Sequence, residues 1–233
     1  MKREEPLITR NEEDYLKTML NMILSGENVA TNSLASRMNV APPSVTSMVK
    51  KLMGKGLIIY QKYGAIYFTA SGEKVAISLT RRHRLWEVFL SQTLNFSWDE
   101  VHEVAEELEH VKSEKLMSRL DKFLGFPKFD PHGDRIPSVD LVFPSVKEAA
   151  LIDISLGQSC QFSAVRDDSS KFLRDLNKIG LKLGMELKIL SNGTHTINLK
   201  CSNSLEIKIP IDWAKKIYAV SYTHLTLPTN REV

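Results

Sequence analysis

The stretch A-P-P-S-V-T-S-M-V-K-K-L, residues 41–52, decides the fold of the first part of the chain. Here we expect Ser44 to cap, or Pro43 to begin, a helix that runs to about Met53. Residues 31–38 predict a second helix just before it. The apolar positions that would hold two such helices at a fixed angle are Leu34, Ala35, Met38, Val40, Val45, Val49 and Leu52. This spacing is typical of a helix-turn-helix.

The sequence on either side completes this module. Residues 11–25 have a helical apolar period and carry Asp14 near the start. Residues 57–60 and 65–69 are rich in β-branched and aromatic side chains around a turn near 63–64, which predicts a β-hairpin. We therefore expect a winged helix-turn-helix over residues 1–73.

Hydroxyl and lysine side chains mark the exposed side of the third helix as a candidate DNA-binding surface. The candidates are Pro43, Ser44, Thr46, Ser47, Lys50, Lys51 and Lys55, with Lys62 from the wing. Hydroxyls near a helix N-terminus can reach base edges or phosphates, and lysines contact phosphates without regard to sequence. The alternative is that these lysines only form a solvated helix face.

A second stretch, H-E-V-A-E-E-L-E-H at residues 102–110, carries candidate metal ligands. His102, Glu106, Glu109 and His110 fall at i, i+4, i+7 and i+8, on one stripe of a helix. The opposite side is apolar and would face a core. Two imidazoles and two carboxylates together suit a divalent cation.

Two further helices flank this stripe. One is expected from a cap at Ser71 to about Leu90, with His83 and Glu87 as an i, i+4 pair. Such a pair alone is more often a surface hydrogen bond than a metal site. Another is expected over residues 113–124. Three consecutive amphipathic helices usually pack together or dimerise, so residues 74–144 predict a helical domain.

The pattern changes after residue 144. Residues 125–137, rich in Pro and Gly, form a turn or linker that contains Asp130 and His132. Short β-like runs at 161–165, 186–190, 194–199 and 205–209, with a helix at 170–178, then predict a small β-barrel domain over residues 145–220. We expect residues 221–233 to be a disordered tail, possibly foreign to the protein.

Bulk composition narrows the class of protein. The net charge of +3, from 31 basic and 28 acidic residues, does not by itself indicate nucleic acid. The two cysteines lack the spacing of a zinc ribbon or a disulfide framework, which favours a reduced, cytoplasmic setting. No signal region or apolar run of roughly 18 to 20 residues predicts secretion or a membrane span.

Taken together, these motifs resemble the diphtheria toxin repressor family, in its manganese-responsive, three-domain branch. The matching stretches are A-P-P-S-V-T-S-M-V-K-K-L, R-R-H-R-L-W-E-V-F-L (81–90), E-E-L-E-H (106–110) and L-G-F-P-K-F-D-P-H-G-D-R-I-P (124–137). The resemblance implies a mainly α fold with small β parts: a winged helix-turn-helix, a helical dimerisation domain and a C-terminal SH3-like β-barrel. It also implies a homodimeric repressor of metal-transport genes that binds double-stranded operator DNA and has no small-molecule substrate.

The resemblance further implies which residues bind metal. The primary ligands would be Asp14, His83, Glu106, Glu109 and His110. An ancillary site would draw on Glu87, Asp130, His132 and Asp167, with His102 taking this role in the iron-responsive branch. Carboxylates at Asp14 and Glu106, where iron-responsive relatives typically have Met and Cys, favour Mn²⁺, with Fe²⁺ as the alternative. Lys17 stands where a two-domain manganese sensor would have a second carboxylate, which argues against a paired-metal cluster.

Two other readings of the residues compete with this one. Carboxylate and histidine ligands also build metalloenzymes, but the helices offer no second E-x-x-H and no separate nucleophile, so we expect no enzyme. The other reading is a winged-helix regulator whose acidic stripe is only solvated.

Overall fold

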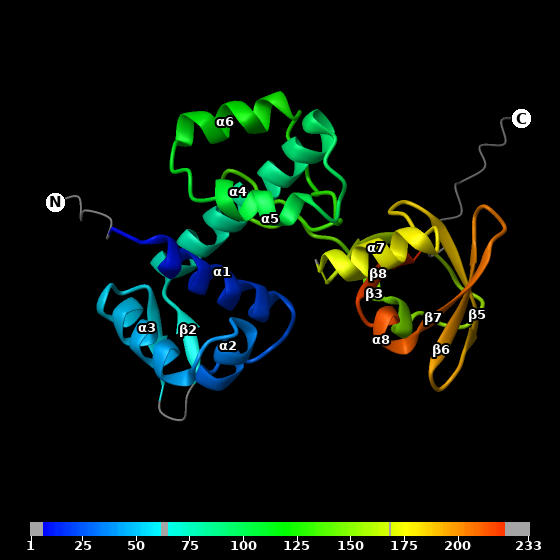
Figure 1. The fold of residues 1–233 in the computed structure, drawn as a ribbon, viewed down its shortest axis with the longest axis horizontal. Helices are drawn as coiled ribbons and strands as arrows, with labels where there is room; N and C mark the ends of the chain where they lie inside the picture. Colours follow the sequence, from blue (N-terminus) through cyan, green and yellow to red (C-terminus); the bar gives the residue numbers. More distant parts are fainter. Residues whose placement is uncertain (1–6, 62–64, 168, 222–233) are drawn as a thin grey trace, which may run out of the picture. The chain divides into compact units, whose positions relative to one another are not determined.

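The computed structural model describes residues 7–61, 65–167 and 169–221. Lys62, the predicted turn at 63–64 and the predicted tail beyond residue 221 therefore lie outside the described residues. The chain divides into two compact units (Figure 1). The first comprises Met1–Leu90, Glu103–Lys128 and Ile136–Pro144, and the second comprises Ser91–His102, Phe129–Arg135 and Ser145–Val233. Among the described residues, no helix combines the length and apolar character that crossing a membrane requires.

The first unit begins with the predicted winged helix-turn-helix. Its elements are α1 (Arg10–Leu24), α2 (Thr31–Arg37), α3 (Pro42–Gly54), β1 (Ile58–Tyr60) and β2 (Ile66–Phe68). The two strands pair antiparallel, with Ile59 opposite Tyr67. Leu34, Val45 and Leu52 are fully buried in one core that α1 also enters. The apolar spacing of residues 34–52 is thus confirmed as the packing of a helix-turn-helix. The exception is Val40, which was expected in this core and is 37% exposed.

Two expected helix starts were wrong by one to three residues. Helix α3 begins at Pro42 with Ala41 as its N-cap, so neither a cap at Ser44 nor a start at Pro43 holds. Proline fits this first position because its missing N–H would have no helical partner there. Helix α4 begins at Ala70, and Thr69 rather than Ser71 caps it, since the Thr69 hydroxyl accepts the Gly72 N–H at 3.1 Å.

The helical part continues with α4 (Ala70–Leu94), α5 (Val101–Leu108) and α6 (Glu114–Phe123). Helix α4 runs four residues beyond the expected end. A small core holds this part together, and its buried members are Leu85, Val88, Met117, Leu120 and Ile136. Ser113 caps α6 by accepting the Leu116 N–H. This cap fixes the residue at which α6 begins.

The second unit carries a six-stranded antiparallel sheet in the order β3-β8-β4-β5-β6-β7 (Figure 1). Its elements are β3 (Ala149–Ala150), a 3-10 helix (Leu151–Asp153), β4 (Ser159–Val165), α7 (Ser170–Lys178), β5 (Glu186–Asn192), β6 (Thr196–Cys201), β7 (Glu206–Pro210), α8 (Ile211–Ala214) and β8 (Ile217–Ser221). Phe162, Leu173 and Ile197 are buried between the sheet and α7. This architecture is consistent with the predicted SH3-like domain.

The sequence patterns located most of this unit but not all of it. The four β-like runs and the helix at 170–178 are confirmed as β4, β5, β6, β7 and α7. Strands β3 and β8 and helix α8 were missed because they are short and lack an alternating pattern. Ser221 was expected in the tail, which was wrong, since it pairs with Cys160 as the last residue of β8.

We predict that Gly72→Ala destabilises the first unit by about 3 kcal/mol, because the close packing of α4 on the wing leaves no room for a methyl group. A Cβ at Gly72 would lie 1.8 Å from the Leu57 carbonyl oxygen. Gly54→Ala is the matched control, since a Cβ there meets nothing within 4 Å. It should stabilise by up to about 1 kcal/mol. Urea unfolding of both variants measures the difference, and equal stabilities would contradict this packing.

Candidate metal centre

Helix α1 positions two of the residues at the centre, Asp14 and Lys17, one turn apart. A capping box fixes its start: the Glu12 carboxylate accepts the Thr9 N–H at 2.7 Å, and the Glu12 N–H reaches the Thr9 hydroxyl. Residues i and i+3 share a helix face, so both side chains are presented to the same neighbour. That neighbour is the segment that ends α5.

The sequence predicted that the four candidate ligands from His102 to His110 share one face of a single helix. This was wrong for the last two of them, Glu109 and His110. Helix α5 ends at Leu108, and Glu109 and His110 lie in the turn that follows. The Arg82 side chain donates to the Glu109 carbonyl at 2.7 Å, which satisfies one of the carbonyls left unpaired at a helix end. The turn thus directs both side chains towards α1.

Asp14, Glu109 and His110 form a three-residue cluster of possible metal ligands. One ligand atom from each lies within 4.8 Å of the others. His110 Nε2 is 3.3 Å from Asp14 Oδ1 and 3.9 Å from Glu109 Oε1. Glu109 Oε1 is buried and accepts no hydrogen bond within the described part of the chain. An orphaned, buried carboxylate oxygen beside an imidazole and a second carboxylate fits a divalent cation.

The orientation of His110 is set by Glu13, which the sequence patterns did not reveal. Glu13 Oε2 lies 2.7 Å from His110 Nδ1, so the other ring nitrogen, Nε2, faces the cluster. Glu13 is 2% exposed and also pairs with Lys112 at 3.1 Å and Arg82 at 3.6 Å. A carboxylate on the far nitrogen of a metal-binding histidine is a common supporting contact. Its only sequence signal was an acidic residue beside Asp14.

Lys17 brings a positive charge into the same cluster. Its ammonium donates to Glu109 Oε2 at 2.8 Å and to Glu106 Oε1 at 3.3 Å. Burial by itself would lower the pKa of Lys17, but the carboxylates of Glu109 and Glu106 raise it overall. Glu106 is therefore near the cluster but is held by Lys17.

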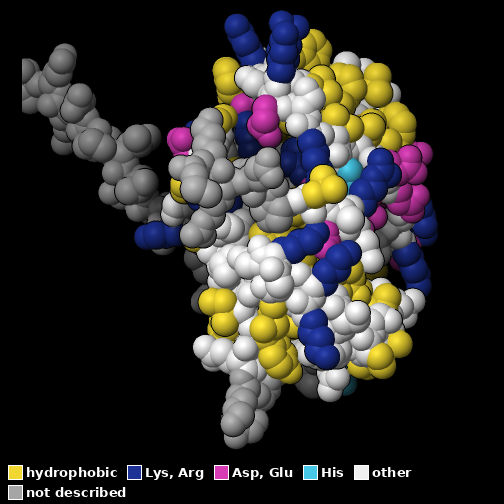
Figure 2. Space-filling model, turned by 90° about the vertical axis from the view of Figure 1, so that its left-hand side faces the viewer, with side chains coloured by type: hydrophobic (Ala, Val, Ile, Leu, Met, Phe, Trp, Pro, Cys, Tyr) yellow, Lys and Arg dark blue, Asp and Glu magenta, His cyan; other side chains and the backbone are white. Residues whose placement is uncertain are grey.

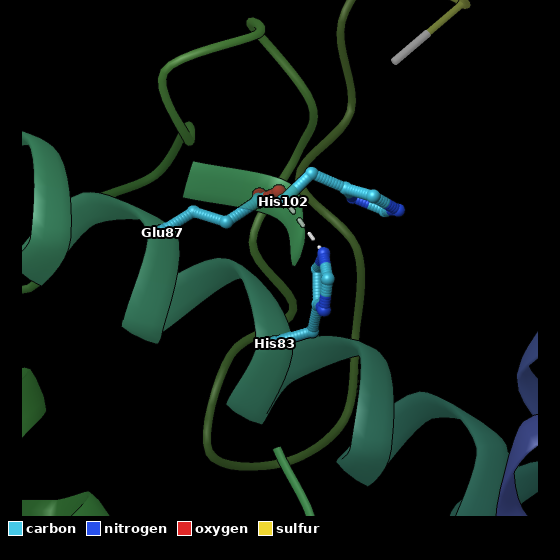
Figure 3. Close-up of side chains that lie close together, drawn as sticks. All are labelled: His83, Glu87 and His102. Carbon is cyan, nitrogen blue, oxygen red and sulfur yellow. Dashed lines mark hydrogen bonds and ion pairs between the residues drawn. The ribbon is translucent and has the colours of Figure 1, made fainter. Parts of the chain in front are cut away.

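His83 lies on α4 between two carboxylates. Its Nε2 is 3.0 Å from Glu87 Oε1 (Figure 3). Its Nδ1 contacts Glu109 Oε2. Burial alone would lower the pKa of His83, whereas Glu87 and Glu109 raise it overall, because both favour the imidazolium. Burial raises the pKa of Glu109, and His83 and Lys17 outweigh it, so that this carboxylate is ionised more readily than usual.

The ancillary candidates are divided between the two units. Glu87 belongs to the first unit, and His102, Asp130, His132 and Asp167 belong to the second. His102, also drawn in Figure 3, lies in the first turn of α5. The joint ancillary site therefore stays a prediction.

Within the second unit, three ancillary candidates are already held by neighbours: Asp130, His132 and Asp167. Asp130 Oδ1 accepts the backbone N–H groups of His132 and Asp134, both at 2.8 Å. His132 Nε2 lies 2.6 Å from the Trp98 carbonyl. Asp167 pairs with Lys216 at 2.6 Å, so its use as a ligand would require that ion pair to open.

The candidate DNA-binding residues of α3 fall into two groups. Pro43, Ser44, Thr46, Ser47 and Lys50 are exposed. All of these except Ser44 line a hollow, together with Ala30, Thr31, Asn32, Pro42 and Tyr60. In the lower half of the face in Figure 2, Lys and Arg side chains stand among neutral and hydrophobic groups.

Lys51 and Lys55, the second group, both contact Glu12 on α1. The distances are 3.3 Å from Lys51 and 2.8 Å from Lys55. Lys55 also donates to the Leu7 carbonyl. Burial raises the pKa of Glu12, but Lys55, Thr9 and Lys51 lower it to about 2 overall. These two lysines therefore join α3 to α1, a role that their sequence pattern did not reveal.

Two protein-family models match this chain, one after the other, within its first 138 residues. Residues 7–66 match the model "Iron dependent repressor, N-terminal DNA binding domain", and residues 69–138 match "Iron dependent repressor, metal binding and dimerisation domain". The "HTH-type transcriptional regulator MntR" of Oceanobacillus iheyensis is 30% identical over 52% of this chain and 82% of its own length. The "Iron-dependent repressor IdeR" of Mycobacterium tuberculosis is 32% identical over 54% of this chain. The aligned part spans only about half, 55%, of IdeR.

Solved structures match over more of the chain. A "Manganese-dependent transcriptional repressor complex with manganese" is 34% identical, with a TM-score of 0.84, and the match covers 90% of this chain and 99% of that one. The "manganese regulator SloR" is 33% identical, with a TM-score of 0.78 over 92% and 100% of the two chains. These similarities extend to the second unit.

We predict that Glu13→Gln weakens Mn²⁺ binding by about 10-fold to 100-fold, because the neutral amide holds the His110 ring less firmly. Glu107→Gln removes the same charge from an exposed position on α5 and should change the affinity by less than about 3-fold. Isothermal titration of both variants with Mn²⁺ measures this. Equal affinities would show that Glu13 does not support the metal ligand.

Proposed function

The chain belongs to the iron-dependent repressor family, which includes the diphtheria toxin repressor, and we propose that it binds operator DNA as a homodimer when it holds Mn²⁺. Its activity is then repression of transcription, exercised on DNA in the cytoplasm, with no reaction catalysed on a small molecule. Metal-transport genes are the targets that this proposal implies.

The observation that carries the proposal is that the ligand cluster joins two parts of the first unit. Asp14 comes from α1, and Glu109 and His110 come from the turn after α5. Helix α1 also packs in the core of the helix-turn-helix through Leu16 and Leu20. An ion that binds all three ligands restrains α1. The ion can thus favour a DNA-competent arrangement to the extent that it binds this arrangement more tightly than the others.

The choice of Mn²⁺ rests on the donor atoms. The residues that would hold the ion are Asp14, Glu109 and His110, with Glu106 and His83 joining if their present ion pairs open. Oxygen-rich sites with imidazole suit Mn²⁺, whereas thiolate and thioether ligands favour softer metals. The bound ion would supply a dication that neutralises the carboxylates. Fe²⁺ is the alternative, since relatives named as iron-dependent repressors also match.

The hollow at α3 supports the DNA-binding part of the proposal. The N-terminus of α3 borders it, and this helix has no acidic residue in its first turn. Helix N-termini attract phosphate through their free N–H groups and the helix dipole. Thr46, Ser47 and Lys50 would then place α3 in the major groove.

Apolar side chains on and after α6 support a homodimer. Phe123 is 67% exposed and Phe126 is 63% exposed, with Leu116 on the same helix as Phe123 also exposed. Large exposed apolar groups close together mark interaction surfaces more often than free surface. We propose that they contribute to the dimer interface, and two copies of α3 would then enter grooves about 34 Å apart.

Operator binding with and without metal tests the proposal. A duplex enriched from a random library in the presence of Mn²⁺ would be titrated with the protein in Mn²⁺ and in EDTA, and followed by fluorescence anisotropy. We expect at least about 100-fold tighter binding with Mn²⁺, consistent with a coupling free energy near 3 kcal/mol. Equal affinities would contradict the metal switch, and a stronger response to anaerobic Fe²⁺ would favour the alternative metal.

We predict that Lys50→Ala weakens binding to any duplex and lowers the slope of log affinity against log salt by about 0.9 for each phosphate that Lys50 neutralises. Lys188→Ala is the control, because Lys188 is an exposed lysine of β5 and lies in the other unit. Its slope should equal that of the wild type. An unchanged slope for Lys50→Ala would remove Lys50 from the phosphate-binding surface.

A further inference from the structure

Lys17 is an unusual side chain to find inside a set of metal ligands. It is only 8% exposed, and its ammonium lies between the carboxylates of Glu109 and Glu106, at 2.8 Å and 3.3 Å. Burying an ammonium is expensive unless it is paired, so these two contacts are what keep it there. Lys17 thus already serves as a cation for two of the five predicted ligands.

The two oxygens of Glu109 face different cation positions. Oε2 accepts from Lys17 and also contacts His83, whereas Oε1 lies on the side of Asp14 and His110. One buried carboxylate is therefore shared between the ammonium and the candidate metal position. A dication bound at Oε1 would repel the ammonium across a single carboxylate, and this repulsion is weakly screened because both lie away from water.

Glu106 is a second carboxylate for which Lys17 and the metal ion would compete. In the structure its Oε1 contacts Lys17, so a metal that binds this oxygen must open that ion pair. Its side chain is 52% exposed, which leaves it room to move. Metal that takes Glu106 and both sides of Glu109 must therefore displace Lys17 from its partners.

We propose that Lys17 is a built-in competitor of the metal ion, an affinity-setting residue that raises the metal concentration at which the cluster fills. This inference rests on the proposed metal site and adds the residue that tunes it. In the metal-free protein, Lys17 also keeps α1 tied to α5, because its ammonium compensates carboxylates that would otherwise repel one another. When metal binds, the metal ion replaces the Lys17 ammonium as the cation between α1 and the end of α5.

Isothermal titration with Mn²⁺ alone tests the proposal in the full chain. Lys17→Met keeps the length of the side chain and removes its charge, so we expect at least about 10-fold tighter binding. Lys188→Met is the matched control, because it removes the same charge from an exposed position on β5 in the other unit. Water screens this charge, and the expected change is less than about 3-fold. Equal or weaker binding by Lys17→Met with an unchanged circular dichroism spectrum would overturn the proposal.

Chemical labelling of the wild type gives a second test that needs no variant. Reductive methylation followed by mass spectrometry would compare Lys17 with Lys112 before and after saturation with Mn²⁺. We expect labelling of Lys17 to rise several-fold as it leaves its partners, while labelling of Lys112 stays constant. Constant or falling labelling of Lys17 would contradict its displacement. Neither test involves DNA, so a failure of the proposed metal switch would appear in the operator titration alone.

Discussion

The buried carboxylate of Glu109 is the constraint on which the centre depends. It is 1% exposed, and a charge at that depth must be paired. Its Oε2 is paired with Lys17 from α1 and His83 from α4, while its Oε1 is left for the position between Asp14 and His110. Three separate elements therefore meet at one side chain, and a change in the occupant of the Oε1 position changes the electrostatic balance among all of them.

Helix α1 connects this centre to the candidate DNA-binding surface. Near its start Glu12 pairs with Lys51 of α3 and with Lys55 just after that helix, and further along α1 Asp14 and Lys17 contact the turn after α5. The ion pairs and the rigid helix make a continuous set of contacts from the cluster to α3. These contacts identify α1 as the element whose position both metal and DNA can bias.

The sequence predicted the elements better than the contacts between them. Periodicity located α3 and α7 because their apolar positions repeat at helical spacing, and the resemblance selected Asp14, Glu109 and His110, which the fold brings together. The end of α5 at Leu108 was missed, because no Gly or Pro marks it. The contacts of Glu13 with His110 and of Lys17 with Glu109 join residues far apart in the chain, and local patterns contain no information about such pairs.

We propose that one metal ion bridges α1 and the turn after α5. The most direct test is a crystal structure of the Mn²⁺-saturated protein, with an anomalous difference map recorded at the manganese absorption edge. We expect a peak within coordinating distance of Asp14, Glu109 Oε1 and His110 Nε2, with the Lys17 ammonium moved away from Glu109. A peak elsewhere, with these three side chains unliganded and the ion pair of Lys17 with Glu109 intact, would contradict this proposal.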